Sequence, residues 1–319
     1  MLTFVIRTAW KKLWTLFFVS IISFGVIHLA PGSPSQIDPL NPRFTREQLQ
    51  RYRAAFDLDR PLPVQYSRFY WKLFTGELRS FKDNQPVLPK IWGRALNSLP
   101  LFLVSTVVVW CYAFPLGIAA AVRRNSTFDK LTTVLVFALI SIPGFYLSDL
   151  AINFVVQRLQ VDVFGLETFG RRSLGWLPWL MDRAWHLVLP SVLGAAGGIA
   201  VLSRYVRSQM LEVVSSDYVR TARAKGLPED GVLYDHALAN ALLPFVTMFG
   251  LLLPGLIGGS VIFETIFAWP GIGRLGYEAI LNRDYPVVVS LGFLAAVLTL
   301  IGTLISDLLY MVVDPRIRL

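Results

Sequence analysis

The sequence predicts an all-α membrane protein with six transmembrane helices, and composition and hydropathy carry this prediction. Of the 319 residues, 54% are hydrophobic and only 16% are charged, whereas soluble chains carry about 25% charged residues. The apolar residues form uncharged windows near or above the roughly 18–20 residues that cross a bilayer as a helix. Continuous windows also exclude a β-barrel, whose strands alternate apolar and polar residues. The windows are Leu13–Ile37, Ala95–Val122, Leu131–Ser148, Ala184–Ser203, Ala237–Phe263 and Tyr285–Ser306.

The first window is predicted to be a retained transmembrane helix within residues 1–30. Arg7, Lys11 and Lys12 precede it, which is an arrangement that cleaved signal peptides share. The apolar run is long for a signal peptide, however, and no A-x-A cleavage site stands out. We therefore expect a signal-anchor helix.

Residues 31–94 are predicted to form an extracytoplasmic helical lobe. The motif LAPGSP at Leu29–Pro34 ends the first helix and turns the chain. Apolar residues at helical spacing follow between Thr45 and Leu58. The lobe is either a structural cap or a contact for an external delivery protein, and the structural role is favoured.

Residues 95–319 are predicted to form a core of five transmembrane helices. Pro115 in the second window and Pro143-Gly144 in the third kink or interrupt their helices. The pairs Gly194/Gly198 and Gly255/Gly259 have the small-xxx-small spacing that lets helix backbones approach closely.

An aromatic and glycine-rich segment, GSVIFETIFAWPGIGRL at Gly259–Leu275, begins at the end of the fifth window and is predicted to be an outside loop. Glu264 is expected where this window leaves the bilayer. Trp269-Pro270-Gly271 predicts a tight turn, and Phe267 and Trp269 are expected at the membrane surface.

The distribution of basic residues predicts that both termini are cytoplasmic, because short cytoplasmic loops are enriched in Lys and Arg. With this orientation the inside segments hold Arg7, Lys11, Lys12, Arg123, Arg124, Lys130, Arg204, Arg207, Arg220, Arg223, Lys225, Arg316 and Arg318. The short outside loops hold only Arg158, Arg171, Arg172, Arg183, Arg274 and Arg283. The long basic segment 31–94 does not overturn this orientation, because long loops translocate largely regardless of charge.

A polar stretch between the fourth and fifth windows, SDYVRTARAKGL at Ser216–Leu227, predicts a short, well-bounded helix. Ser216 is suited to cap its start, and Asp217 stabilises the first turn against the helix dipole. Arg223 and Lys225 fall in the last turn, and Gly226 supplies a left-handed stop. From the pattern alone, the helix is either a connector lying on the membrane surface or a docking element for a cytoplasmic partner.

The sequence offers no catalytic or metal-binding motif. It contains no GxxxxGK[ST] phosphate loop, no HExxH and no GxSxG, and Cys111 is its only cysteine. We therefore expect no catalytic residues, no metal and no cofactor bound by this chain. The net charge of +9 is explained by basic residues beside an anionic leaflet and requires no nucleic acid. The window centres are nearly free of charge, which counts against a proton-coupled carrier.

Five motifs in order give the chain an end-to-end resemblance to ABC importer permeases, in the dipeptide, oligopeptide and nickel branch. RTARAKGL at Arg220–Leu227, followed by His236-Ala237-Leu238 and Leu242-Leu243-Pro244, resembles the cytoplasmic "EAA" loop of that family. LAPGSP, ETIFAWPGIG at Glu264–Gly273, NRDYP at Asn282–Pro286 and DPRIR at Asp314–Arg318 are similar to further marks of the branch.

The resemblance implies a division of labour among subunits. A second homologous permease completes the pathway, two cytoplasmic ATPase subunits bind ATP and Mg²⁺, and an extracytoplasmic solute-binding protein delivers the substrate. The loop 204–236 is implied to couple this chain to one ATPase. The coupling residues carried over are Asp217, Tyr218, Arg220, Thr221, Ala222, Arg223, Ala224, Lys225, Gly226, Leu227 and His236. Ala222, Ala224 and Gly226 are expected to pack in a groove of the ATPase, and Arg220, Arg223 and Lys225 to pair with its acidic rim.

The sequence departs from the family pattern directly after Gly226. Many relatives carry basic residues there, whereas this chain has Glu229, Asp230 and Asp235. Our hypothesis is that the ATPase partner carries compensating basic residues near these positions.

The expected function is therefore half of the pathway of an ATP-driven importer in a bacterial or archaeal cell membrane. Di- and oligopeptides are the expected substrates, although nickel complexes, glutathione and oligosaccharides are handled by the same branch. The alternative is an autonomous secondary transporter, and the coupling helix discriminates between the two. The residues that line the pathway are not predicted.

Overall fold

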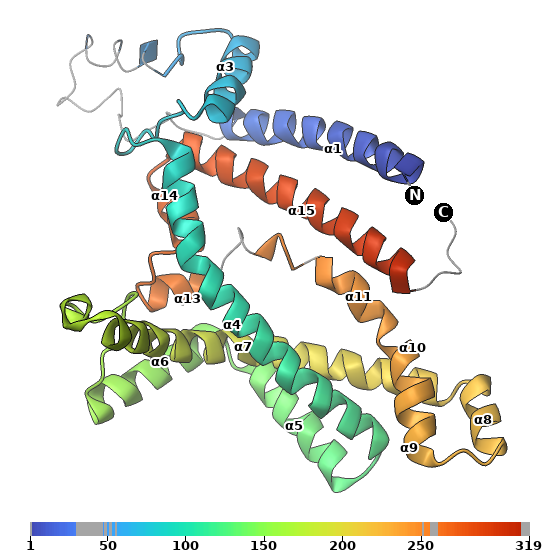
Figure 1. Cartoon of the computed structure of the whole chain (residues 1–319). Coiled ribbons are helices and arrows are strands. Elements are labelled where there is room, and N and C mark those ends of the chain that lie inside the picture. Colours follow the sequence, from blue (N-terminus) through green and yellow to red (C-terminus); the bar gives the residue numbers. More distant parts are fainter. Residues whose placement is uncertain are drawn as a thin grey trace.

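The computed structural model describes residues 2–29, 47, 50, 53–54, 56–250, 252–255 and 261–313. Over these ranges the chain is almost entirely helical (Figure 1). The helices are α1 (Leu2–Leu29), α3 (Leu62–Thr75), α4 (Val87–Val122), α5 (Thr127–Ser141), α6 (Gly144–Phe154), η1 (Val155–Leu159), η2 (Arg171–Leu174), α7 (Trp176–Val214), α8 (Asp217–Ala224), α9 (Glu229–Gly231), η3 (Val232–Leu238), α10 (Ala239–Ala241), α11 (Leu243–Gly250), α13 (Val261–Ile266), α14 (Ile272–Leu281) and α15 (Tyr285–Val313).

Five of the described helical stretches are long and apolar enough to cross a membrane. They are Trp10–Leu29, Val87–Val122, Trp176–Val214, Glu229–Gly250 and Tyr285–Val312. A sixth span results only if α5 and the α6–η1 helix are taken together, and these two are bent by 91°. The predicted all-helical membrane class is confirmed, and the third predicted span is a broken one.

The break in the third span has a local cause. Ile142 has an extended backbone with ψ of 121°, and Pro143 follows it at the N-cap of α6. The proline ring disfavours a helical conformation in the preceding residue, so α5 ends there. Pro115, in contrast, lies inside α4 without ending it. Of the two predicted proline sites, only Pro143 interrupts its helix.

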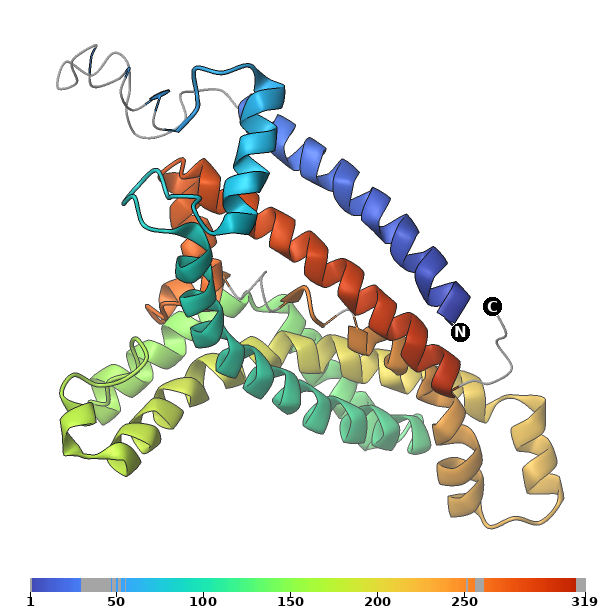
Figure 2. The ribbon, with the colours of Figure 1, turned by 45° about the horizontal axis from the view of Figure 1, so that its top comes forward.

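The long helices α4 and α7 make the most extensive helix contact of the described chain (Figures 1 and 2). Glycines allow this close approach: a Cβ placed on Gly117 would lie 2.5 Å from the carbonyl oxygen of Ser203. A Cβ on Gly198 would lie 2.8 Å from Val109, so this predicted packing glycine is confirmed. Gly259, the partner predicted for Gly255, lies outside the described residues.

On the other side of the molecule, α15 packs against both α1 and α11 (Figure 2). Gly250 of α11 and Gly302 of α15 face each other so closely that neither has room for a Cβ. The fifth predicted window, Ala237–Phe263, is not one straight helix. It contains part of η3, then α10 and α11, and later the start of α13.

The lobe region contains α3 and a turn that leads into α4. Helix α4 begins at Val87, so the end of the predicted lobe 31–94 already belongs to this long helix. Half of the residues between Thr45 and Leu58, for which helical spacing was predicted, lie outside the described residues, as does the LAPGSP motif beyond Leu29. The predicted 1–30 helix corresponds to α1.

Candidate functional site

Helix α8 stands at one end of the molecule, between the end of α7 and η3 (Figure 1). It begins at Asp217, as the sequence predicts, but the predicted side-chain cap is wrong. The Ser216 hydroxyl donates to the carbonyl oxygen of Val213 at 2.6 Å instead of accepting from the start of α8. The carboxylate of Asp217 in the first turn is left to stabilise the positive end of the helix dipole.

The predicted stop of α8 is present. Gly226 adopts a left-handed φ of +78°, and its backbone N–H donates to Arg223 at 2.9 Å. A Cβ at this position would meet nothing within 4 Å. The glycine is therefore required by backbone conformation and not by space within this chain.

One face of α8 is buried against its own subunit. Val219 is fully buried and Ala222 is 8% exposed, and both pack with Val232 and Ala237 of η3. Val213 and Val214, at the end of α7, close this cluster. The position of Ala222 corrects the expectation that its side chain packs in a partner's groove, because it faces inward and anchors α8.

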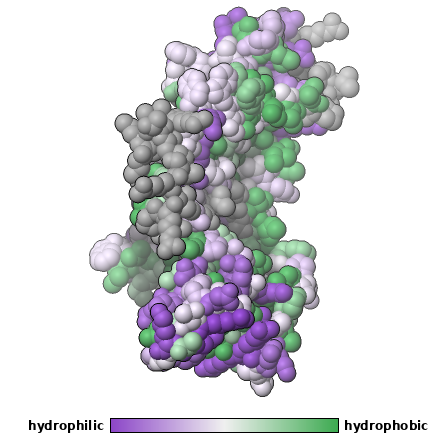
Figure 3. Space-filling model, turned by 90° about the vertical axis from the view of Figure 1, so that its right-hand side faces the viewer, coloured by the Kyte–Doolittle hydropathy of each residue, from purple (hydrophilic) through white to green (hydrophobic). Residues whose placement is uncertain are grey.

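The opposite face of α8 and the following turn are exposed. Most of the other residues carried over from the family pattern lie there: Asp217, Tyr218, Arg220, Thr221, Arg223, Ala224, Lys225, Gly226 and Leu227. His236 is also exposed but lies on η3. Hydrophilic residues gather at this end of the molecule, as Figure 3 shows for the side on which α8 lies in Figure 1. Tyr218 and Leu227 add apolar area, at 47% and 43% exposure. The face combines an aromatic side chain with cations, as docking surfaces often do.

The charges of this face are partly paired within the chain. The Arg223 guanidinium donates to Glu229 with Nη2–Oε1 at 2.7 Å and Nε–Oε2 at 3.1 Å. This hydrogen bond raises the pKa of Arg223. Arg220 lies 3.5 Å from Asp217 in a fully solvated pair. Glu229 therefore competes for Arg223 with the acidic rim expected on the partner.

A second group of buried polar contacts joins α13 and α14 to α4. Glu264 is completely buried, and its carboxylate accepts from the Ser98 hydroxyl at 2.7 Å and the Arg274 backbone N–H at 2.8 Å. Ser98 Oγ also accepts from the backbone N–H of Ile272 at 2.8 Å. A Cβ at Gly271 would collide with both the carboxylate and the hydroxyl. Glu264 therefore acts as an internal clamp that joins α13, the turn after it and α4.

The aromatic residues beside this clamp are also internal. Phe267 and Trp269 are fully buried, and the indole N–H of Trp269 donates to the carbonyl oxygen of Asn97 at 2.9 Å. Asn97 returns a hydrogen bond from its amide to the carbonyl oxygen of Pro270 at 3.0 Å. The expectation that these two aromatic residues lie at the membrane surface is wrong, because both side chains are fully buried within the protein.

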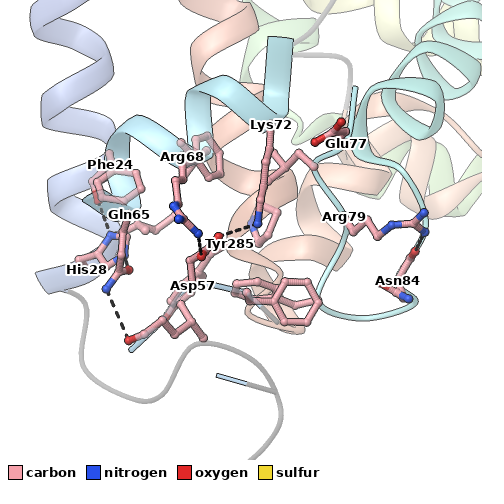
Figure 4. A pocket seen from close by; sticks show the side chains of 18 of the residues that line it. Phe24, His28, Asp57, Gln65, Arg68, Lys72, Glu77, Arg79, Asn84 and Tyr285 are labelled. Atoms are coloured by element: carbon pink, nitrogen blue, oxygen red, sulfur yellow. Dashed lines mark hydrogen bonds and ion pairs between the residues drawn. The ribbon is translucent and has the colours of Figure 1, made fainter. Parts of the chain in front are cut away.

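The lobe contains a cavity of about 630 Å³ that the sequence did not predict (Figure 4). It lies between α1, α3, the segment 77–84 and the start of α15, and its aromatic lining is Phe24, Phe56, Phe69, Phe81 and Tyr285. Asp57 accepts from Lys72 at 2.6 Å and from Arg68 at 2.5 Å. Burial alone would raise the pKa of Asp57, but these hydrogen bonds outweigh it and lower the pKa. The ion pairs of Asp57 thus join the turn before α3 to α3 itself.

Comparison with known proteins assigns the chain to a family. Residues 113–319 match the model of the binding-protein-dependent transport system inner membrane component, and residues 1–101 match the N-terminal membrane component of these systems. The chain belongs to this family of ABC importer permeases, in the peptide and nickel branch. It is a multi-pass membrane protein, as its helices also indicate.

Curated relatives of the permease match over its whole length. The oligopeptide transport system permease protein AppB of Bacillus subtilis is 37% identical over all of both chains. The glutathione transport system permease protein GsiC of Escherichia coli K12 is 35% identical over all of this chain and 99% of the relative. The dipeptide transport system permease protein DppB of Alkalihalophilus pseudofirmus is 33% identical over all of both chains.

Two of the five permease motifs are thus placed in separate regions, NRDYP runs from the end of α14 into α15, and DPRIR lies outside the described residues. RTARAKGL and the following histidine surround α8, and ETIFAWPGIG forms the buried clamp on α4. The sequence did not predict the roles of Ser98 and Asn97, the α4 residues that bond to Glu264 and Trp269, because no motif lies beside them in the chain. It also missed the pairing of Arg223 with Glu229, although their separation of six residues across a glycine turn was a usable signal.

Proposed function

We propose that this permease forms half of the translocation pathway of an ATP-driven importer of di- and oligopeptides. A second homologous permease supplies the other half, two ATPase subunits bind on the side of α8, and a solute-binding protein delivers substrate on the opposite side. The observation that supports this proposal is α8 itself, a bounded helix with one face anchored to its own chain and the other exposed.

The proposed topology places both termini and α8 in the cytoplasm of a bacterial or archaeal cell. The start of α1 and the end of α15 lie close together, on the side of the molecule that carries α8 (Figures 1 and 2). This arrangement agrees with the enrichment of basic residues predicted for cytoplasmic segments.

The coupling mechanism we propose is rigid-body transmission. Closure of the ATPase pair moves α8, and the Val219–Ala222 face passes this movement to Val213 and Val214 of α7. Helix α7 then continues without a break over 39 residues, from Val214 back to Trp176. A movement at α8 therefore reaches the far side of the core through one helix.

Charge places a constraint on the ATPase partner. Glu229 is engaged by Arg223, so the basic residues that we expect on the partner face Asp230 and Asp235. Among the residues that the structure describes, these two aspartates and Lys225 make no ion pair. Stable assembly with an ATPase whose facing surface is uniformly acidic would contradict this part of the proposal.

Peptides are the proposed substrate class because the relatives named for oligopeptides, dipeptides and glutathione all act on peptides. Much of the selectivity among them is expected to belong to the solute-binding protein. The ligand of that protein, identified by mass spectrometry after its gentle purification, tests the substrate class independently of this chain.

Copurification tests the assembly. The permease is purified from its native membrane as wild type and as the variants Tyr218→Ala and Tyr277→Ala. These tyrosines are similarly exposed, at 47% and 44%, but Tyr277 lies on α14, far from α8. We expect Tyr218→Ala to lose ATPase and Tyr277→Ala to retain it, because aromatic side chains often dominate docking energies. A single-chain preparation that transports without ATP would refute the proposal and favour an autonomous carrier.

A further inference from the structure

Asp129 is a buried carboxylate that joins two helices at the α8 end of the core. It lies in the first turn of α5 and is only 3% exposed. The guanidinium of Arg207 on α7 approaches it in a two-pronged pair, with Nε–Oδ1 at 2.7 Å and Nη2–Oδ2 at 2.8 Å. The backbone N–H of Asn125 donates to the same carboxylate at 2.9 Å. The geometry matches the fork of an arginine to both carboxylate oxygens, which is the strongest form of this ion pair.

A second contact joins the same two helices, one turn away along α7. The guanidinium of Arg204 lies over the ring of Phe137 on α5, 4.0 Å from its centroid. Cations are attracted to aromatic faces at this distance. Gly117 of α4 packs against Ser203, which is next to Arg204 on α7, so α4, α5 and α7 meet at this point.

This junction lies directly behind α8. Arg207 is seven residues before Val214, the last residue of α7, so about 10 Å of helix separates them. Val214 packs into the cluster that anchors α8. At its other end, α5 stops at the break beside Pro143. Helix α5 is thus joined to α7 through Arg207 and Arg204, and the break beside Pro143 separates it from α6.

We propose that Asp129 and Arg207 form a latch that makes α5 move with α7 when α8 moves, so that the half-span α5 belongs to the coupling arm. This inference rests on the proposed function, because it needs an ATPase that moves α8. Without the latch, α7 moves alone and the broken span stays behind. Asp129 and Arg207 are accordingly positioning residues, and the 91° bend is the joint about which α5 turns.

Distances between spin labels test the latch in the purified complex. Cys111 is first replaced by serine, and labels are placed on exposed Leu135 of α5 and Val201 of α7. A second pair joins Leu135 to exposed Phe154 of α6, across the bend. Between the nucleotide-free and ATP-trapped states we expect the α5–α7 distance to stay constant and the α5–α6 distance to change. A change in the α5–α7 distance in the wild type would overturn the latch.

Variants separate coupling from folding. Asp129→Asn should let the α5–α7 distance shift between states and lower peptide uptake per ATP hydrolysed by about tenfold, within the range by which mutations between coupled sites change their coupling, while ATPase activity persists. Arg207→Lys, which keeps the charge but not the fork, should fall between this variant and the wild type. Asp149→Asn, at an exposed aspartate of α6, is the matched control and should behave as wild type. A purely structural role would lower uptake and ATPase activity together through loss of complex, and this result would also overturn the proposal.

The outcomes also separate the latch from the proposed function. If no ATPase accompanies the permease, the proposed function fails and the latch fails with it. If ATP shifts a label on α8 relative to α15 and the α5–α7 distance changes as well, only the latch fails.

Discussion

Gly226 offers the sharpest test of the stop of α8, because the structure separates backbone conformation from space. Its φ is +78°, and a Cβ there would meet nothing within 4 Å. A substitution therefore acts through the left-handed backbone alone. The series Gly226→Asn, Gly226→Ala and Gly226→Val varies that strain without introducing a collision inside the chain.

The magnitude follows from the cost of the left-handed conformation. An ordinary L-residue loses roughly 1–2 kcal/mol there, whereas asparagine tolerates it better. The β-branched side chain of valine is the least suited. A loss of this size reduces the correctly ended form of α8 by roughly 5–30-fold. We expect uptake to decline in the order Asn, Ala, Val.

The assay measures peptide uptake and ATP hydrolysis by the assembled transporter in the same vesicles. The Gly226→Val variant should hydrolyse ATP with little uptake, because a frayed α8 transmits the movement poorly. Gly231→Ala is the matched control: Gly231 has a helical φ of −63°, and an added Cβ would come no closer than 3.7 Å to its neighbours. It should transport normally.

Two results would refute this reasoning. Normal uptake by Gly226→Val would show that the left-handed stop is not needed for coupling. Uptake as poor in Gly226→Asn as in Gly226→Val would show that glycine is needed for close approach by a partner and not for its φ.

Three further predictions follow from the other regions. Gly271→Ala should destabilise the purified chain by about 1–3 kcal/mol, as at other overpacked sites, and lower its yield, because the added methyl collides with the Glu264 clamp. Gly292→Ala, with open space around the added methyl, is the control and should be as stable as the wild type. Equal melting temperatures for the two variants would contradict the clamp. The folded lobe lowers the pKa of Asp57, so its stabilisation is complete above the ordinary value of about 4 and is lost as the pH falls from there through the lowered value. Protection of the lobe against hydrogen exchange, corrected for the intrinsic pH dependence of exchange, should therefore fall at acidic pH in the wild type, and Asp57→Asn should lose this dependence. Arg223→Gln should leave the thermal stability unchanged, because the ion pair that it breaks is exposed, and a clear drop in melting temperature would argue against this.

The sequence by itself determined the features that depend on neighbouring residues. Hydropathy decides whether a stretch enters a bilayer, so the helical membrane class followed from uncharged windows. The start of α8 at Asp217 and its stop at Gly226 are likewise local, because dipole, charge and backbone preference act within one turn. The family could be predicted for the same reason, since its motifs are short runs of adjacent residues.

Only the tertiary structure decided which side chains meet across the chain. Trp269 looked like a membrane-surface residue until α4 supplied a carbonyl partner 172 residues away, and Glu264 meets Ser98 across 166 residues. Ala222 has the small side chain of a docking residue, but Val232 and Ala237 cover it. Asp129 and Arg207 are separated by 78 residues, and neither carries a local sign of its partner. Such contacts depend on how whole helices are placed, and the hydropathy and capping rules that identify a helix contain no information about its neighbours.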